Sequence, residues 1–289
     1  MNLRNGLSND GRSFTAHIFE GFGKGEDLSQ IKLDTDDRIG AILDIEATGL
    51  DKKQDEIIEV AVRKFIFNSK NGKIKSIGQT YTALQQSTKP LSDIIIKITG
   101  LTDKKLAGHK INWQEFDQYI DDVSLIIAHN AQFDRAFIDR YSKESTKTIW
   151  GCSWYHVPWR DYFPVQSQEG LALIHGFFYE GHRALADVDA LLKLIQMSAT
   201  DNGDTYFKTI MEESNKPTYW VFAENAKRDK KDILKQRRYW WDTDKRCWKK
   251  RFSSITDVNL EMGFLGSEIY PSKNLAKVET VRPVENFKL

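Results

Sequence analysis

The sequence contains little cysteine: Cys152 and Cys247 are the only two, they lie far apart, and they form no Cys-x-x-Cys pair. This spacing predicts neither a disulfide framework nor a zinc site, so we expect two reduced thiols. Apolar runs long enough to span a membrane, roughly 20 residues, are also missing, and residues 1–6 lack the apolar stretch of a secretion signal. We therefore expect a cytoplasmic protein without a membrane partner.

The chain has almost no net charge, because 42 Lys and Arg oppose 41 Asp and Glu. The balance by itself neither favours nor excludes a nucleic-acid partner. The distribution is uneven, however: residues 216–251 hold 13 Lys and Arg against 5 Asp and Glu, which leaves 29 against 36 elsewhere. Four of the eight tryptophans lie in this basic stretch: Trp220, Trp240, Trp241 and Trp248.

Two acids, Asp44 and Glu46, interrupt an apolar run that is typical of a buried strand. Residues i and i+2 of a strand project from the same face, so both carboxylates converge on one point, where leaving them unpaired costs several kcal/mol. A divalent cation would remove that cost. The alternative is that the pair lies at the solvent end of the strand, just before the turn at Thr48 and Gly49.

Two further acids occupy core positions of expected helices. Asp134 lies on the apolar face of the segment 131–141, and Asp187 flanks the apolar stripe of a helix that begins at Ala184. His182 is five residues before Asp187, which places it in the preceding loop, where a histidine can take up a proton. His175, at an expected helix end, is the competing base, although a structural role suits it better.

Three segments resemble, in order, the motifs of the DEDD superfamily of 3′-to-5′ exonucleases: Asp44-Ile-Glu46-Ala-Thr-Gly, His129-Asn-Ala-Gln-Phe-Asp134 and His182-Arg-Ala-Leu-Ala-Asp187. The resemblance runs from about residue 37 to residue 200. It indicates the histidine subtype, because Arg183 stands where the tyrosine subtype has Tyr. The chain is similar to the proofreading epsilon subunit of bacterial DNA polymerase III and to stand-alone relatives of that subunit.

This resemblance implies a two-metal phosphodiester hydrolase, with two Mg²⁺ or Mn²⁺ ions roughly 4 Å apart. It implies that Asp44 bridges both ions, that Glu46 and Asp187 complete the first, and that Asp134 holds the second. His182 would accept the proton of the attacking water, and 5′-mononucleotides would leave from a 3′ end. Oxygen ligands without cysteine favour Mg²⁺ or Mn²⁺ over Zn²⁺.

Five further residues match family positions near the substrate. Thr48, Gly49 and Leu50 correspond to a turn that touches the terminal nucleotide, with Leu50 placed to wedge against its base; a plain strand-ending turn is the alternative. His129 and Asn130 match a His-Asn pair, while a structural His129 and a helix-capping Asn130 explain them equally well.

The predicted architecture is α/β. Residues 39–46, 56–68 and 73–84 predict an antiparallel three-stranded unit, whose last two strands join at the hairpin signal Asn71-Gly72, and 124–128 predicts a further short strand. The resemblance specifies a ribonuclease H-like mixed sheet flanked by helices, with the first strand central. We expect a flexible N-terminal arm (1–36), the exonuclease domain (37–200) and a small basic, Trp-rich C-terminal module (201–289).

The C-terminal module alternates aromatics with cations, which is typical of stacking platforms in basic grooves that bind nucleic acid. Buried tryptophans in a small packed domain would give the same pattern, and we favour a packed domain that also touches nucleic acid. Deleting residues 201–289 should then weaken binding to long single strands.

Three functions are compatible with the sequence. The first is a metal-dependent 3′-to-5′ exonuclease that acts on DNA 3′ ends, preferentially single-stranded, in proofreading or repair, alone or as a DNA polymerase subunit. The second keeps the chemistry but trims RNA, since no motif reports contacts to a 2′-hydroxyl. The third is a polymerase or clamp accessory that binds without cutting, and it fits less well because all five catalytic positions are filled.

Overall fold

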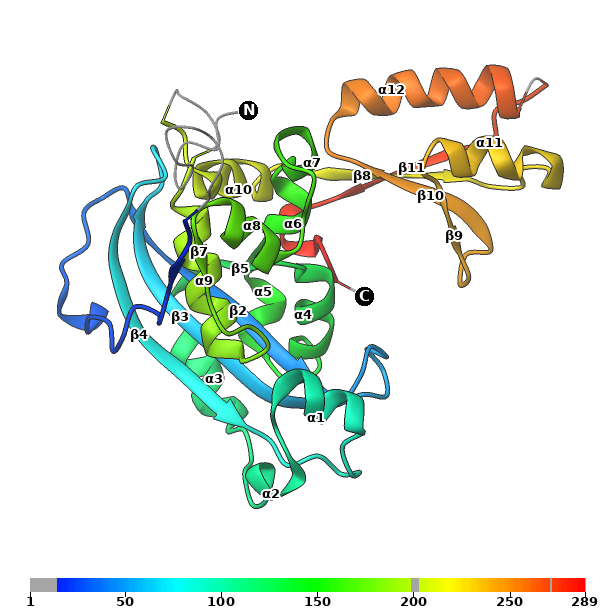
Figure 1. Ribbon diagram of the computed structural model, residues 1–289. Coiled ribbons are helices and arrows are strands. Elements are labelled where there is room, and N and C mark those ends of the chain that lie inside the picture. The colour runs from blue at the N-terminus through cyan, green and yellow to red at the C-terminus, as the bar shows by residue number, and fades with distance from the viewer. Residues whose placement is uncertain (1–14, 199–202, 271, 289) are drawn as a thin grey trace. The chain divides into compact units, whose positions relative to one another are not determined.

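The computed structural model describes residues 15–198, 203–270 and 272–288 (Figure 1). The chain divides into two compact units, the first comprising Met1–Ser214 with Phe287–Leu289 and the second Asn215–Asn286. The domain limits expected at residues 36 and 200 stay predictions, and the second of them falls outside the described residues. Within the described residues, no helix has both the length and the apolar character needed to cross a membrane.

The first unit is built on a five-stranded mixed sheet with the spatial order β4-β3-β2-β5-β6. Neighbouring strands among the first three are antiparallel, whereas β5 runs parallel to β2 and β6 runs parallel to β5. This arrangement confirms the expected antiparallel unit and the ribonuclease H-like mixed sheet, whose central strand is β2, the first strand of this sheet in the sequence. The strands are β2 (Asp37–Ala47), β3 (Ile57–Asn68), β4 (Ile74–Leu84), β5 (Val123–Ala128) and β6 (Ile149–Cys152).

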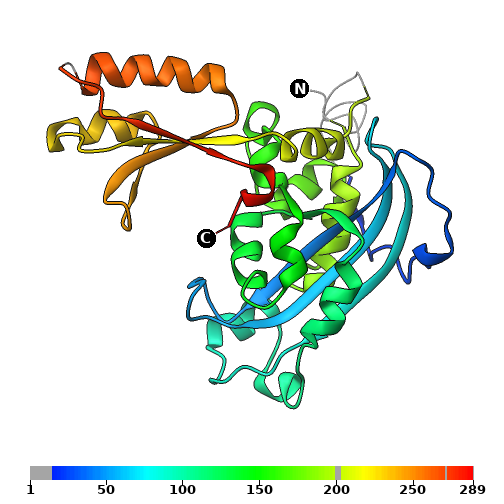
Figure 2. The same cartoon turned by 180° about the vertical axis from the view of Figure 1, so that it is seen from behind.

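Helices cover both faces of this sheet, as Figures 1 and 2 show from opposite sides. They are α1 (Asp93–Thr99), α2 (Asp103–Leu106), α3 (Trp113–Ile120), α4 (Ala131–Ile138), α5 (Lys143–Lys147), α6 (Ser153–His156), α7 (Trp159–Tyr162), α8 (Gln168–Ile174), α9 (Ala184–Ile195) and α10 (Tyr206–Ser214).

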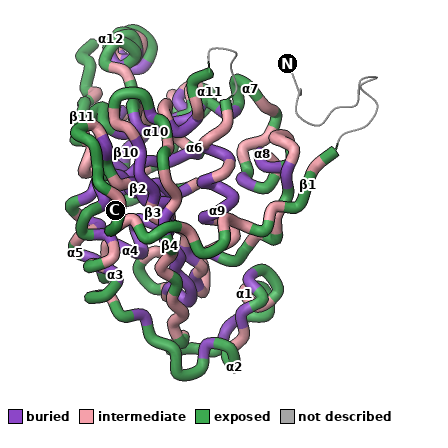
Figure 3. The backbone as a smooth tube through the Cα atoms, turned by 90° about the vertical axis from the view of Figure 1, so that its left-hand side faces the viewer, coloured by how far each residue is buried: buried purple, intermediate pink, exposed green. Residues whose placement is uncertain are grey.

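Alternation along β2 distributes its side chains between two hydrophobic cores. Leu43 and its i±2 neighbours pack with Phe116 of α3 and Phe137 of α4, while Ile42 packs in the core that α8, α9 and α10 share. Figure 3 shows β2 and β3 as largely buried. Because Asp44 and Glu46 have the same parity as Ile42, they project toward the face that α9 covers.

The described part of the N-terminal segment, residues 15–36, packs on the first unit. Its strand β1 (His17–Ile18) pairs in parallel with β7 (Phe177–Phe178), and it includes the short helix η1 (Leu28–Gln30). A buried ion pair anchors it: Arg63 and Asp189 are joined side chain to side chain, Arg63 donates to the carbonyl of Gly23 (2.9 Å), and the Phe22 N–H donates to Asp189 (3.0 Å).

The second unit alternates strands and helices around one antiparallel sheet of spatial order β11-β8-β10-β9. Its hydrophobic core joins Val221 and Trp248 of the sheet to Leu234 and Val258 of two helices. The elements are β8 (Thr218–Ala223), η2 (Arg228–Lys230), α11 (Lys231–Gln236), β9 (Trp240–Asp242), β10 (Cys247–Phe252), α12 (Ile255–Phe264), η3 (Leu265–Ile269), β11 (Lys277–Val281) and η4 (Pro283–Glu285). This is the βαββαβ pattern of ferredoxin-like modules.

Candidate active site

Three of the predicted acids meet at the end of the central strand. Asp44 and Glu46 extend from β2, Asp187 extends from the first turn of α9, and carboxylate oxygens of all three lie within 4.8 Å of one another. The strand register shifts between Glu46 and Ala47, where β2 ends its pairing with β3. The group offers only oxygen ligands, which suit a hard divalent cation such as Mg²⁺ or Mn²⁺.

Asp134, the fourth predicted acid, lies in the first turn of α4 and is only 3% exposed. It is not a member of the three-residue group, but its charge contributes to raising the pKa values of Asp44 and Glu46, so it faces the same site. Burial raises the pKa of Asp134 itself to about 7, although hydrogen bonds from its own backbone and from that of Ile45 act in the opposite direction.

The carboxylates repel one another in a partly buried site. Burial, followed by the charges of Asp187 and Asp134, raises the pKa of Asp44 well above its ordinary value. Burial and the charge of Asp187 likewise raise the pKa of Glu46 to about 8, and the nearby Arg183 only partly compensates. At neutral pH the chain alone therefore favours a protonated Glu46, and a cation of charge +2 would favour the ionised form.

Two neighbours that sequence reasoning missed hold Asp187 in place. The Tyr179 hydroxyl donates to its carboxylate at 2.8 Å, and the Gln168 amide donates to its backbone carbonyl at 2.9 Å. The backbone N–H of His182 donates to the other carboxylate oxygen, also at 2.8 Å. Tyr179 and Gln168 belong to no motif, so only the fold brings them to this acid.

His182 lies in the loop before α9, as its spacing from Asp187 predicted. Its backbone adopts a left-handed conformation (φ 63°), which is uncommon outside glycine. The side chain is 55% exposed, and its Nε2 lies 3.5 Å from a carboxylate oxygen of Glu169. The His182 ring is thus exposed to solvent, while its backbone N–H is hydrogen-bonded to Asp187.

A second pair of charges borders the site. Glu59, the register partner of Glu46 on β3, is buried and accepts hydrogen bonds from the Arg183 guanidinium (2.9 Å) and the Ala184 N–H (3.2 Å). Glu59 is therefore neutralised by a cation of the chain itself.

The turn after β2 holds the three residues expected near a terminal nucleotide. The Thr48 hydroxyl donates to Asp55 and accepts from the Glu56 N–H, both at 3.0 Å, so it braces the turn. A Cβ at Gly49 would lie 2.4 Å from the Asp55 carboxylate, which explains the glycine. Leu50 is 82% exposed and leaves an apolar side chain in solvent beside the acids' strand.

The His-Asn pair precedes α4. Both ring nitrogens of His129 are engaged, with the Ser153 hydroxyl (2.6 Å) and the Gln166 carbonyl (2.9 Å), and burial lowers its pKa to about 4. Asn130 occupies the N-cap position, but its exposed side chain makes no capping hydrogen bond. His175 is also engaged at both nitrogens, by the Leu171 carbonyl and the Tyr206 hydroxyl, which supports a structural role.

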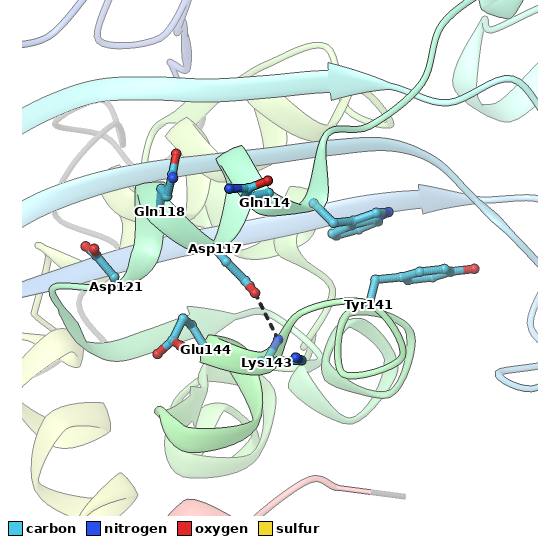
Figure 4. A pocket seen from close by; sticks show the side chains of 8 residues that line it. Gln114, Asp117, Gln118, Asp121, Tyr141, Lys143 and Glu144 are labelled. Carbon is cyan, nitrogen blue, oxygen red and sulfur yellow. Dashed lines mark hydrogen bonds between the residues drawn. The ribbon is translucent and has the colours of Figure 1, made fainter.

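One pocket of the first unit, of about 420 Å³, lies away from every predicted site residue (Figure 4). The Trp113 and Tyr141 rings, stacked 4.7 Å apart, form part of its wall. Asp117, which accepts from the Lys143 backbone N–H at 3.2 Å, is one of three acids among its lining residues, which are Trp113, Gln114, Asp117, Gln118, Asp121, Tyr141, Lys143 and Glu144. This acidic lining does not suit a polyanion.

A family model described as Exonuclease, RNase_T, matches residues 41–195, which is more than half of the chain and includes all the acids described above. Among curated proteins, the chain is similar to the PolC-type DNA polymerase III of Halalkalibacterium halodurans (36% identity over 101 residues, 34% of this chain and 6% of the relative). It is also similar to the PolC-type polymerase of Thermotoga maritima (33% over 116 residues, 39% and 8%). The chain thus spans only a small part of these relatives.

Among solved structures, exonuclease X in complex with 5′-overhanging duplex DNA aligns with a TM-score of 0.42 and 22% identity, covering 59% of this chain and 99% of that chain. Exonuclease I of E. coli in complex with a dA16 oligonucleotide aligns with a TM-score of 0.46 and 14% identity, covering 75% of this chain and 63% of that chain.

Proposed function

Because this chain belongs to the RNase_T exonuclease family, we propose that it is a metal-dependent 3′-to-5′ exonuclease that hydrolyses DNA from the 3′ end to 5′-mononucleotides. The observation that supports this most strongly is the convergence of Asp44, Glu46 and Asp187 at the end of β2, with oxygens within 4.8 Å and no neutralising cation of the chain in contact among the described residues. The PolC-type relatives are DNA polymerases, which favours DNA over RNA and a role in proofreading or repair.

The donor set fits divalent metal. Asp44, Glu46 and Asp187 would hold one Mg²⁺ or Mn²⁺, and Asp44 with the buried Asp134 would hold a second. Burial and neighbouring acids raise the pKa values of Glu46 and Asp134, and the positive charge of a bound metal would offset both effects. When bound, the metals supply Lewis acidity that activates water and stabilises charge on the phosphodiester.

The protein's own groups would then orient the metal ligands and accept the proton of the attacking water. His182 is the proposed general base, because its exposed ring lies beside the acids and its backbone is fixed to Asp187. Glu169, whose carboxylate oxygen lies 3.5 Å from the His182 Nε2, would help to orient the ring. Tyr179 would orient Asp187 through its 2.8 Å hydrogen bond.

The terminal nucleotide would rest on the turn after β2. The exposed Leu50 side chain would pack against the last base. Thr48 and Gly49 belong to the turn that Asp55 stabilises, and their backbone would contact the same nucleotide. The exposed Asn130 amide makes no capping hydrogen bond and would contact the DNA strand. Both ring nitrogens of His129 are engaged within the protein, so His129 would support the site structurally.

The test is the degradation of 5′-labelled DNA and RNA strands of the same sequence in Mg²⁺, Mn²⁺ or chelator by the intact protein, Asp44→Ala and His182→Ala. We expect a metal-dependent ladder that shortens from the 3′ end, faster on DNA and lost in both variants. Glu56→Gln, which alters an acid outside the site, is the matched control and should retain activity.

Two results would count against the proposal. Faster degradation of RNA would assign the chain to RNA trimming, and no cleavage with any metal would favour an accessory that binds without cutting. Association with a DNA polymerase, suggested by the PolC-type relatives, needs a separate co-purification from a bacterial host expressing both proteins.

A further inference from the structure

The second unit has an open pocket of about 450 Å³ that no part of the proposed catalytic chemistry uses. It lies where α11 and the preceding η2 meet the β9 edge of the sheet. Its lining combines three cations with two aromatic rings and contains no acid: Ala226, Arg228, Lys231, Lys235, Trp241 and Trp248.

The three cations are available for a ligand. Arg228, Lys231 and Lys235 are exposed, and among the residues that the structure describes none of them pairs with a carboxylate. Their spacing of three and four residues sets them along one side of a helical segment, over about 10 Å. That length exceeds a single phosphate group and suits a chain of phosphates.

Three cations elsewhere in this unit are already neutralised. Lys245 pairs with Glu279 (2.7 Å), Lys249 with Asp242 (2.6 Å), and Lys277 with Glu224 (2.7 Å). The three pocket cations differ from these three, because no carboxylate of the described residues pairs with them.

The aromatic lining offers a stacking surface. Trp241 is 49% exposed and rests edge-on against the buried Trp248, with ring centroids 5.6 Å apart at 74°. Its neighbour Trp240 is similarly exposed, at 44%, but strand alternation directs it to the opposite face, where it contacts Trp220. An exposed indole beside unpaired cations suits an unstacked base attached to phosphates.

We propose that this pocket binds single-stranded DNA, with Arg228, Lys231 and Lys235 contacting successive phosphates and Trp241 stacking on a base. Only the choice of DNA rests on the proposed function; the binding of a single-stranded polyanion rests on the pocket itself. The site would hold the strand independently of the acidic centre.

The test is the affinity of the full chain for a 5′-labelled 20-nucleotide oligo-dT, followed by fluorescence anisotropy in chelator over a salt series. Chelator prevents metal-dependent hydrolysis, so the result does not depend on catalysis. The pocket variant replaces Arg228, Lys231 and Lys235 with Ala; the control variant replaces Lys227, Lys245 and Lys277, which removes the same charge outside the pocket.

We expect the pocket variant to reduce the slope of log K against log salt concentration by about 2, since each phosphate contact with a single strand contributes about 0.7. The control variant should change the slope by much less. Trp241→Ala should weaken binding about five-fold or more at fixed salt, and Trp240→Ala should not. Trp241→Leu, which keeps an apolar contact to Trp248, distinguishes lost stacking from lost folding.

Equal slopes for the pocket and control variants would overturn the proposal, as would equal competition by blunt duplex DNA. Hydrolysis of a dinucleotide, measured with the same variants in Mg²⁺, should be unchanged, because a dinucleotide is too short to need the pocket. If the dinucleotide is not hydrolysed even by the unaltered protein, the proposed catalytic function fails while the binding result stands.

Discussion

Glu46→Gln should make the metal-free protein more stable at alkaline pH while removing its activity. In the structure, Glu46 shares a small volume with Asp44 and Asp187, and its pKa rises from 4.5 to about 8. Glutamine keeps the size of the side chain and removes its charge. The substitution therefore removes repulsion from the folded state without opening a cavity.

The sign of the effect follows from proton binding. Between about pH 4.5 and pH 8 the unfolded chain has lost the Glu46 proton and the folded chain retains it, so the free energy of unfolding falls as pH rises through this window. One pKa unit corresponds to about 1.4 kcal/mol, which places the upper limit of the loss near 5 kcal/mol. Because neighbouring acids can take up the proton instead, we expect Glu46→Gln to gain roughly 2 to 4 kcal/mol at pH 9 relative to pH 5.

The assay is urea unfolding of the protein and the variant in chelator at pH 5 and pH 9, repeated with Mg²⁺. At pH 9, Mg²⁺ should stabilise the unaltered protein, by about 2.7 kcal/mol at 100 times its dissociation constant, and should stabilise the variant much less. Glu56→Gln is the control. Burial raises the pKa of Glu56, but hydrogen bonds from Thr88 outweigh it and the net shift is downward, so this variant should not gain stability at pH 9.

The reasoning is refuted if Glu46→Gln and the unaltered protein have the same difference in unfolding free energy between the two pH values. It is also refuted if Mg²⁺ stabilises both equally at pH 9, because the cation would then bind elsewhere.

Three side chains outside the proposed metal-binding carboxylates give further tests. Leu50→Ala should weaken binding of a DNA 3′ end by about 1 kcal/mol or more, and leave the unfolding midpoint unchanged because the side chain is 82% exposed; KM and thermal unfolding measure the two effects. Tyr179→Phe removes the hydroxyl that orients Asp187 and should weaken metal affinity about 10- to 100-fold in a calorimetric titration. Arg63→Met leaves the buried Asp189 carboxylate without its cation and should cost about 3 to 5 kcal/mol in urea unfolding, part of which Arg63→Met with Asp189→Leu should restore.

The central strands could be predicted because their signals are local. Apolar runs and the Asn71-Gly72 turn predict strands at 56–68 and 73–84, and the structure has β3 at Ile57–Asn68 and β4 at Ile74–Leu84, with Gly72 at φ 69°. The packing of residues 15–36 could not be predicted, since it depends on Arg63 and Asp189, which are 126 residues apart. A glycine-containing polar segment has no local signal that distinguishes an anchored loop from a free arm.

The same limit applies to the site. Strand alternation brings Asp44 and Glu46 together from the sequence alone, but the distance from this pair to Asp187 depends on how α9 crosses the sheet. Tyr179 and Gln168, which fix Asp187, lie in segments whose composition predicts nothing about metal. The sequence therefore predicts which acids are candidate ligands better than it predicts the residues that orient them.

The acids proposed as metal ligands differ from the structural acids in whether the chain pairs them with a cation. Asp187 and Asp189 are two residues apart on α9, yet Asp189 is neutralised by Arg63, while Asp187 receives only hydrogen bonds from neutral donors. Glu46 and Glu59 are register partners on adjacent strands, yet Glu59 is neutralised by Arg183. In each pair one acid forms an ion pair with an arginine and the other does not. The two acids without an arginine partner, Glu46 and Asp187, converge with Asp44. Unpaired acids at this density destabilise a metal-free fold, and the proposed divalent cation would relieve that repulsion.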